Sequence, residues 1–275
     1  MYFAFLRRSP FLNIINMKKL ASLFIALVAI LSVSACRIEK TNDNNEPAET
    51  YTLNLRDFHS IKNYTSCDIH FTQSDTFKVV LKATPHWYAS HSITARYGEL
   101  VITQKEEKKK KGITVLHINS YNDDAELWIS APSLTDITTA GSGDFYAETP
   151  ITGNDLNLSI AGSGDSKLKS VTLTGNFTYS VAGSGDIKTG SLQARNVSFS
   201  ISGSGDVDSK LTKVETTKLA IAGSGDGTLA FDNCGYANVS ISGSGDITLS
   251  GTLRSYDKSI SGSGDIDTDK LQLGK

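Results

Sequence analysis

Aspartate and serine recur at a regular spacing in the second half of this sequence, and both residue types could do chemistry there. They belong to the tetrapeptide Gly-Ser-Gly-Asp, which occurs seven times, with successive copies 21, 21, 20, 20, 20 and 19 residues apart. A row of stacked carboxylates could bind a cation such as Ca²⁺, which takes six to eight oxygen ligands. The seven aspartates are Asp144, Asp165, Asp186, Asp206, Asp226, Asp246 and Asp265.

The regular spacing predicts a solenoid, because self-similarity at this period indicates one structural unit that stacks on its neighbours. Apolar and small polar residues alternate before each tetrapeptide, as at Val197, Phe199 and Ile201, which is typical of a half-buried strand. Apolar residues return after it, as at Val207 and Leu211. We therefore expect an all-β fold, a parallel β-helix with about 20 residues per coil.

Two glycines in each tetrapeptide predict a turn, because glycine accepts a positive φ without a steric penalty from Cβ. The neighbouring Ser and Asp can bond nearby backbone amides. We expect both glycines of every copy to be structural turn residues. They are Gly141, Gly143, Gly162, Gly164, Gly183, Gly185, Gly203, Gly205, Gly223, Gly225, Gly243, Gly245, Gly262 and Gly264.

The aspartate column needs compensation, because carboxylates one strand spacing apart repel by about 0.9 kcal/mol even in bulk water. Three compensations are open. Each Asp could accept backbone N–H bonds from its own or the adjacent turn, which is the interpretation we favour. Cations such as Ca²⁺ could instead lie between the coils, or a few Asp residues could serve catalysis or ligand binding.

The first half of the domain, residues 51–130, precedes the repeat β-helix of residues 131–275. We predict strands at 66–72, 76–83, 100–104, 112–119 and 125–130, which would form irregular first coils or a cap over the open end of the solenoid. The charged run from Lys105 to Lys111 is predicted to be a solvated loop.

Histidines, aromatics and cysteines in this domain form no recognisable site. The histidines His59, His70, His86, His91 and His117 have no metal-ligand spacing, so no metal site is predicted from them. Trp87, Tyr88 and Trp128 could stack on sugar rings, although aromatic residues in β domains more often pack in the core or at an edge. Cys67 and Cys234 could form a disulfide, but we expect separate packed thiols.

The N-terminal residues predict export and lipid anchoring. Met17, the expected translation start, precedes two lysines and a short apolar run, which is typical of a secretory signal in residues 1–35. Small residues before Cys36 resemble a bacterial lipobox, with cleavage before Cys36 and lipid attached to it. The polar residues 36–50 are predicted to be a tether. A formal net charge of −2 gives no indication of a nucleic-acid partner.

Three sequence features together resemble a known family. These are Leu55-Arg56-Asp57-Phe58 with Ile61, the segment Leu127-Trp128-Ile129-Ser130-Ala131-Pro132-Ser133-Leu134, and the serial Gly-Ser-Gly-Asp, which follow a lipoprotein leader. Over roughly residues 51–273 the chain resembles the auto-transporter adhesin, head GIN domain family (DUF2807). The resemblance implies a right-handed parallel β-helix and an adhesin-like role.

The expected function is that of a non-enzymatic envelope lipoprotein. Repetition gives a solenoid a long lateral face, and we expect this face to bind a glycan or an envelope protein while the lipid holds the chain at the outer membrane. A polysaccharide-active β-helix enzyme and a structural or regulatory envelope component are the alternatives. Charged residues after the turns show no recognisable catalytic pattern: Lys167, Lys169, Lys188, Lys210, Asp208 and Asp267.

Overall fold

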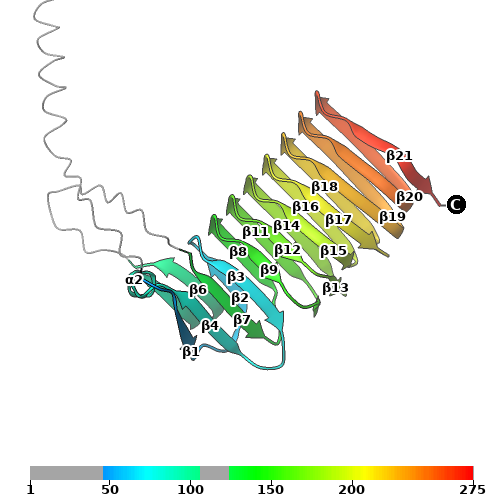
Figure 1. The fold of residues 1–275 in the computed structure, drawn as a ribbon. Coiled ribbons are helices and arrows are strands. Elements are labelled where there is room, and N and C mark those ends of the chain that lie inside the picture. Colours follow the sequence, from blue (N-terminus) through cyan, green and yellow to red (C-terminus); the bar gives the residue numbers. More distant parts are fainter. Residues whose placement is uncertain (1–45, 106–123, 275) are drawn as a thin grey trace, which may run out of the picture. The chain divides into compact units, whose positions relative to one another are not determined.

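The computed structural model describes residues 46–105 and 124–274 (Figure 1). The predicted signal segment, Cys36, most of the tether, the strand at 112–119, His117 and most of the Lys105–Lys111 run lie outside the described residues. Within the described residues all 21 strands belong to one hydrogen-bonded sheet. The prediction of an all-β solenoid with about 20 residues per coil is confirmed.

The strands that precede the Gly-Ser-Gly-Asp corners form one parallel ladder, visible in Figure 1 from green to red. Each coil is in register with the last, so that Gly162, for example, pairs with both Gly141 and Gly183. The ladder contains β8 (Asp136–Gly141), β11 (Leu156–Gly162), β14 (Asn176–Gly183), β16 (Asn196–Gly203), β18 (Thr216–Gly223) and the second parts of β19 (Gly227–Gly243) and β20 (Ile247–Gly262).

The strands that follow the corners form a second parallel ladder. It contains β9 (Phe145–Ala147), β12 (Ser166–Leu168), β15 (Ile187–Gln193), β17 (Val207–Thr212), the first parts of β19 and β20, and β21 (Ile266–Leu273). A short third ladder, β10 (Ile151–Gly153) with β13 (Val171–Leu173), continues into the second half of β15. Every coil of the repeat therefore turns a corner at the tetrapeptide and resumes as a strand, as the sequence predicts.

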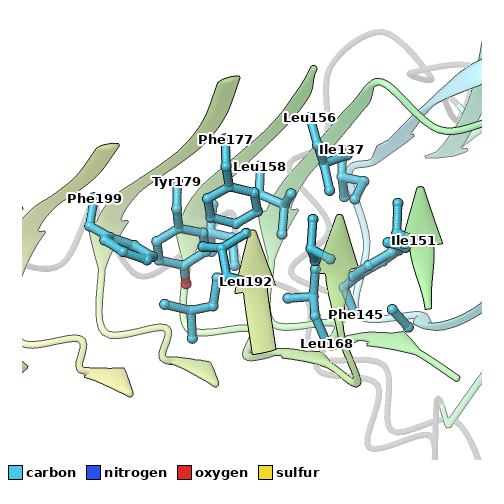
Figure 2. Packing of buried hydrophobic residues seen from close by; sticks show 14 of the residues in the cluster. Ile137, Phe145, Ile151, Leu156, Leu158, Leu168, Phe177, Tyr179, Leu192 and Phe199 are labelled. Atoms are coloured by element: carbon cyan, nitrogen blue, oxygen red, sulfur yellow. The ribbon is translucent and has the colours of Figure 1, made fainter. Parts of the chain in front are cut away.

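The core fills the space enclosed by the coils. Figure 2 shows Tyr179 and Phe199 from the first ladder near Leu192 from the second half of β15, and all three side chains are fully buried. The rings of Tyr179 and Phe199 meet edge to face with centroids 6.4 Å apart. Full burial of one large apolar side chain contributes about 1.5–3 kcal/mol, so the alternating pattern seen in the sequence is what holds the coils closed.

One coil is inserted out of sequence order. β2 (Phe58–Asn63) and β3 (Asp68–Gln73) form this coil, and both are parallel to their neighbours on either side. β2 lies between β6 (Gly98–Gln104) and β8, while β3 lies between β7 (Glu126–Ala131) and β9. The coil that is second in space is therefore the first in the sequence. Neither β2 nor this order was predicted.

Antiparallel strands and one helix close the N-terminal end of the coils. β1 (Glu49–Leu53) pairs with β4 (Lys78–Ala83), β4 pairs with β7, and β5 (His91–Arg96) pairs with β6, all antiparallel. The short helix α2 (Pro85–Ser90) begins at Thr84, whose side chain accepts the Trp87 N–H, and buries the Trp87 ring. The residues before the repeat therefore supply both irregular first coils and a cap.

The two glycines of each tetrapeptide have different roles. The first has a positive φ in all seven copies, for example 142° at Gly203. The second, such as Gly205, does not, although it too belongs to the turn. Glycine is needed at this second position because no room is left for a side chain. A Cβ on Gly205 would lie inside van der Waals contact of the Gly185 carbonyl oxygen one coil earlier.

Replacement of Gly203 by alanine should cost more than about 1 kcal/mol of unfolding free energy. The φ of Gly203 is unfavourable for alanine, and the new Cβ would meet the carbonyl oxygen of Gly183. Gly153→Ala is the matched control, because a Cβ there would meet only Leu173 Cδ2 at an ordinary 3.7 Å. Urea unfolding of both variants measures the difference, and equal stability would contradict the close stacking of the corners.

Candidate functional site

The seven corner aspartates form a hydrogen-bonded column. In each coil the carboxylate Oδ1 accepts the backbone N–H of the aspartate in the next coil, at 2.7–3.0 Å. Backbone donors are therefore the compensation for carboxylate repulsion that the structure shows. Because every bond runs from one coil to the next, the column also fixes the register of the corners.

The column begins one coil earlier than the sequence motif indicated. Asp68 Oδ1 accepts the N–H of Asp144 at 2.9 Å, so Asp68 is an eighth member. It ends the corner Thr65-Ser66-Cys67-Asp68, which keeps the Ser and Asp of the tetrapeptide but has Thr and Cys in place of the glycines. The Ser-x-Asp spacing before a strand was the signal that could have found it.

Asn63 compensates for the loss of glycine at this corner. Its amide Nδ2 donates to the Cys67 carbonyl at 2.7 Å, and its Oδ1 accepts from the Thr65 hydroxyl at 2.7 Å. Cys67 is a free, buried thiol whose pKa is raised by burial, and Cys234 is likewise free and buried. The expectation of separate packed thiols is confirmed.

Desolvation acts on the column even though backbone donors stabilise it. Partial burial raises the pKa of Asp186, the amide of Asp206 opposes this shift, and the charges of Asp206 and Asp165 add to it. Partial burial raises the pKa of Asp68 in the same way. At Asp68 and Asp186, therefore, the amide donors offset the cost of burying the carboxylate only in part.

An open groove runs beside this column. Its lining combines column members such as Asp165 and Asp186 with side chains two residues after the corner aspartates, chiefly Lys167, Lys188 and Asp208. Lys188 Nζ and an Asp208 carboxylate oxygen are 2.8 Å apart, with both side chains more than half exposed. The groove thus presents charges of both signs.

Three aromatic rings extend the same outward row toward the N-terminal coils. Trp128 on β7, His70 on β3 and Tyr146 on β9 are in register. His70 lies between the other two rings, nearly parallel to both, with centroids 5.1 Å from Trp128 and 4.9 Å from Tyr146. We call Trp128, His70, Tyr146, Lys167, Lys188 and Asp208 the lateral stripe, since successive members pair across adjacent strands.

Lysines cover both ends of the aromatic stack. Lys82 Nζ lies 6.0 Å from the centroid of Trp128, and Lys167 Nζ lies 5.4 Å from that of Tyr146. The ring faces are therefore occupied by one another and by cations, so the ring edges are what a ligand would meet. Edges carry partial positive charge and favour oxygen atoms.

Acidic groups hold the stack in place. Glu148 Oε1 lies 2.8 Å from His70 Nδ1, and the Tyr146 hydroxyl donates to Asp144 Oδ2 at 2.6 Å. The bond to Asp144 is the main reason that the pKa of Tyr146 is raised. Tyr146 thereby connects the lateral stripe to the aspartate column.

Only one of the three aromatic candidates from the sequence joins this row. Trp128 does, with 38 % of its surface exposed, whereas Trp87 is buried under the cap and Tyr88 stacks on Tyr51 with centroids 4.1 Å apart. His70 and Tyr146 were not among the candidates from the sequence. Alignment of the Asp68 and Asp144 corners would have found them, because each follows its aspartate by two residues.

The described residues contain no group of three or more His, Cys, Asp or Glu side chains placed to hold a metal ion. Calcium binding by the corner aspartates therefore stays a prediction. In the same part of the chain no helix has the length and apolar character needed to cross a membrane.

Two substitutions of Asp186 separate its structural role from its charge. Asp186→Asn keeps an oxygen that can accept the Asp206 N–H, so the unfolding free energy should change by less than about 0.5 kcal/mol. Asp186→Ala removes the acceptor and should cost about 1–2 kcal/mol. Thermal unfolding in EDTA measures both; an asparagine variant as unstable as the alanine variant would show that the charge itself is required.

Comparison with solved structures supports the fold. A putative adhesin from Bacteroides fragilis NCTC 9343 is 20 % identical, with a TM-score of 0.70 over 82 % of this chain and 99 % of its own. A protein from Parabacteroides distasonis ATCC 8503 described as a putative lipid binding protein is 27 % identical, with a TM-score of 0.66 over 83 % and 99 %. A putative adhesin from the same organism is 18 % identical, with a TM-score of 0.57 over 82 % and 98 %.

Comparison with family models shows the family to which the chain belongs. A search of curated proteins found no match. The family model described as "Putative auto-transporter adhesin, head GIN domain" (DUF2807) matches residues 57–233 and again residues 210–275. These matches contain the inserted coil, every Gly-Ser-Gly-Asp corner and the whole lateral stripe. The chain therefore belongs to this adhesin head-domain family.

Proposed function

We propose that this protein is a non-enzymatic, adhesin-like binding protein of the cell envelope, and that its lateral stripe binds an extended glycan. The observation that carries the proposal is the row of outward side chains in register on successive strands, from Trp128 to Asp208. Its members repeat at the strand spacing of about 4.8 Å, which suits a polymer better than a single small molecule. The family assignment supports an adhesin-like role.

A glycan fits the chemistry of the stripe. Sugar hydroxyls both donate and accept hydrogen bonds, and the stripe offers ammonium donors at Lys167 and Lys188 and a carboxylate acceptor at Asp208. The aromatic ring edges would meet sugar oxygens, while the covered ring faces leave little room for a sugar to stack on them. Hydrogen bonding would therefore dominate recognition.

Catalysis and lipid binding are less well supported. A glycosidase needs two carboxyl groups at a set separation with distinct roles, whereas the corner aspartates repeat and each accepts a backbone amide from the next coil. The neighbour described as a putative lipid binding protein suggests a second ligand class. Apolar side chains fill the interior of the coils here, and the described groove is lined largely by charged groups, which suits acyl chains poorly.

Envelope anchoring through Cys36 completes the proposal. The family assignment is consistent with a surface or envelope protein, and the signal-like residues before Cys36 supply the means of export. A lipid on Cys36, followed by the polar residues 37–48, would hold the solenoid near the outer membrane and leave its lateral stripe accessible.

Binding to a broad glycan array tests the proposed ligand class. We expect selective binding by the purified protein, at least tenfold weaker in Lys167→Ala, because this change removes a charged donor at the centre of the stripe. Lys218→Ala is the matched control: Lys218 is an exposed lysine on β18, before the corner instead of after it, and its loss should leave binding unchanged.

Three outcomes would contradict the glycan proposal. Equal weakening by both lysine changes would indicate nonspecific charge attraction. Binding of anionic and neutral lipid vesicles without glycan binding would favour the lipid alternative. Release of reducing ends or unsaturated products from an array ligand during incubation would identify an enzyme.

Replacement of Cys36 by serine should move the protein from the membrane fraction to the soluble fraction. Serine has no thiol to carry a lipid, so incorporation of an alkyne-labelled fatty acid should also be lost. Cys67→Ser is the matched control, since Cys67 is buried in the described domain and should not affect either readout. Fatty-acid labelling that persists in the Cys36 variant would contradict anchoring at this residue.

A further inference from the structure

Positively charged side chains gather on three consecutive coils, just after the corners. Lys167 lies on β12 and Lys169 directly follows that strand, Lys188 lies on β15, and Lys210 lies on β17. All four side chains are exposed. This concentration of lysines is not a requirement of the repeat, because the corresponding positions of the next two coils hold small uncharged residues. They are Thr228, Ala230, Thr248 and Ser250.

Three of these lysines surround a glycine. Thr189 on β15 pairs in register with the residues directly before Lys169 and Lys210. Gly190, the next residue, therefore lies between these two lysines, about 4.8 Å from the strand of each. Lys188 lies two residues earlier on the same strand and projects to the same outer side. We call Lys169, Lys188 and Lys210 the lysine triangle.

The surface between the three lysines is bare backbone. A Cβ on Gly190 would lie inside van der Waals contact of the Lys169 carbonyl oxygen, so close packing of the coils requires glycine there. The register also shifts directly after Thr189, where two residues of β15 oppose one residue of β17. Such a bulge leaves one residue unpaired in the ladder. An incoming group would thus meet ammonium groups and backbone, with no side chain between them.

Nearby acidic groups leave this triangle positively charged. Lys188 Nζ lies 2.8 Å from an Asp208 oxygen, but no described residue forms an ion pair with Lys169 or Lys210. Glu148, which precedes Lys169 in the same outward row, bonds to the histidine of the lateral stripe instead. The corner aspartates come four residues before this row, roughly 13 Å along an extended strand.

We propose that the lysine triangle holds an anionic group of the ligand, a carboxylate or a sulfate, and that the ligand is therefore an acidic polysaccharide. This inference rests on the proposed glycan-binding function. Lys188 belongs to both the triangle and the lateral stripe, so a charged substituent on a chain along the stripe can reach Gly190. Its oxygens would accept hydrogen bonds from ammonium groups of opposite charge, which are stronger than bonds between neutral groups.

A single anionic substituent suits this surface better than a membrane does. Anionic lipids present a broad negative surface, which would also approach the corner aspartates and Asp208. A substituent on a narrow polymer contacts the triangle without placing like charges against the aspartate column. Charge complementarity therefore favours the polysaccharide over the lipid surface.

Binding of the purified full chain to three oligosaccharides tests the proposal. They are oligogalacturonate, the same oligomer with its carboxylates methyl-esterified, and a sulfated chondroitin oligomer. We expect at least one acidic oligomer to bind at least roughly tenfold more tightly than the neutral ester, because only charged oxygens form charge-assisted bonds with the triangle.

Two double variants locate this preference. Lys169→Gln with Lys210→Gln removes two charges outside the lateral stripe and should abolish the preference for acidic oligomers, whereas Lys169→Arg with Lys210→Arg should keep it. Lys78→Gln with Lys218→Gln is the matched control, because it removes two exposed lysines on β4 and β18 with the same change of net charge. This control should retain the preference.

The results distinguish failure of this inference from failure of the proposed function. Equal binding of the acidic and esterified oligomers, both weakened by Lys167→Ala, would overturn the inference and retain glycan binding. A preference lost equally in the control variant would show a general charge effect and would also overturn it. Binding of phosphatidylglycerol vesicles through the triangle, with no acidic oligomer bound, would assign the site to lipid. No binding to these oligomers or to any glycan of the array would overturn both proposals.

Discussion

The close approach of backbone to backbone at each corner is the constraint on which the rest of the structure depends. The Gly183 carbonyl accepts the Ser204 N–H at 2.9 Å, and the same oxygen occupies the space that a Cβ on Gly203 would need. A side chain there would push two coils apart and break their register. Glycine at this position therefore determines that the strands on both sides of the corner stack in line.

Register at the corners has a consequence for function, because it turns a repeated sequence into straight rows of side chains. The aspartate row is used internally, since each Oδ1 accepts an amide from the next coil. The row two residues further on faces outward and varies from aromatic to basic to acidic. A repeated scaffold with a varied neighbouring row can provide rigidity and selectivity at once.

The sequence predicted the repeated part well and the inserted part poorly. Alternating apolar residues and serial tetrapeptides determine strands, corners and core, because each coil repeats the same local physics. At the inserted coil, Thr65 and Cys67 replace the glycines and Asn63 supplies the missing stabilisation, so the motif is hidden. The position of that coil between β6–β7 and β8–β9 depends on tertiary pairing, which no spacing in the chain records.

The lateral stripe was difficult to predict for the same reason. His70, Trp128 and Tyr146 come from three separate segments and become neighbours only through the inserted coil. Sequence reasoning found Trp128 as one aromatic candidate of three, but it could not tell that Trp87 would be buried beneath a cap. Exposure alone does not separate the candidates either, since Tyr88 is as exposed as Trp128 but stacks on Tyr51 in the cap.

A crystal structure of the protein with its strongest glycan ligand tests the central claim most directly. We expect a saccharide chain along the lateral stripe, with oxygens near Lys167 and Lys188 and near the ring edges of Tyr146. The corner carboxylates should keep their backbone amide bonds, with no cation between them. A glycan bound on another face, or bound through calcium at Asp165 and Asp186, would contradict the account.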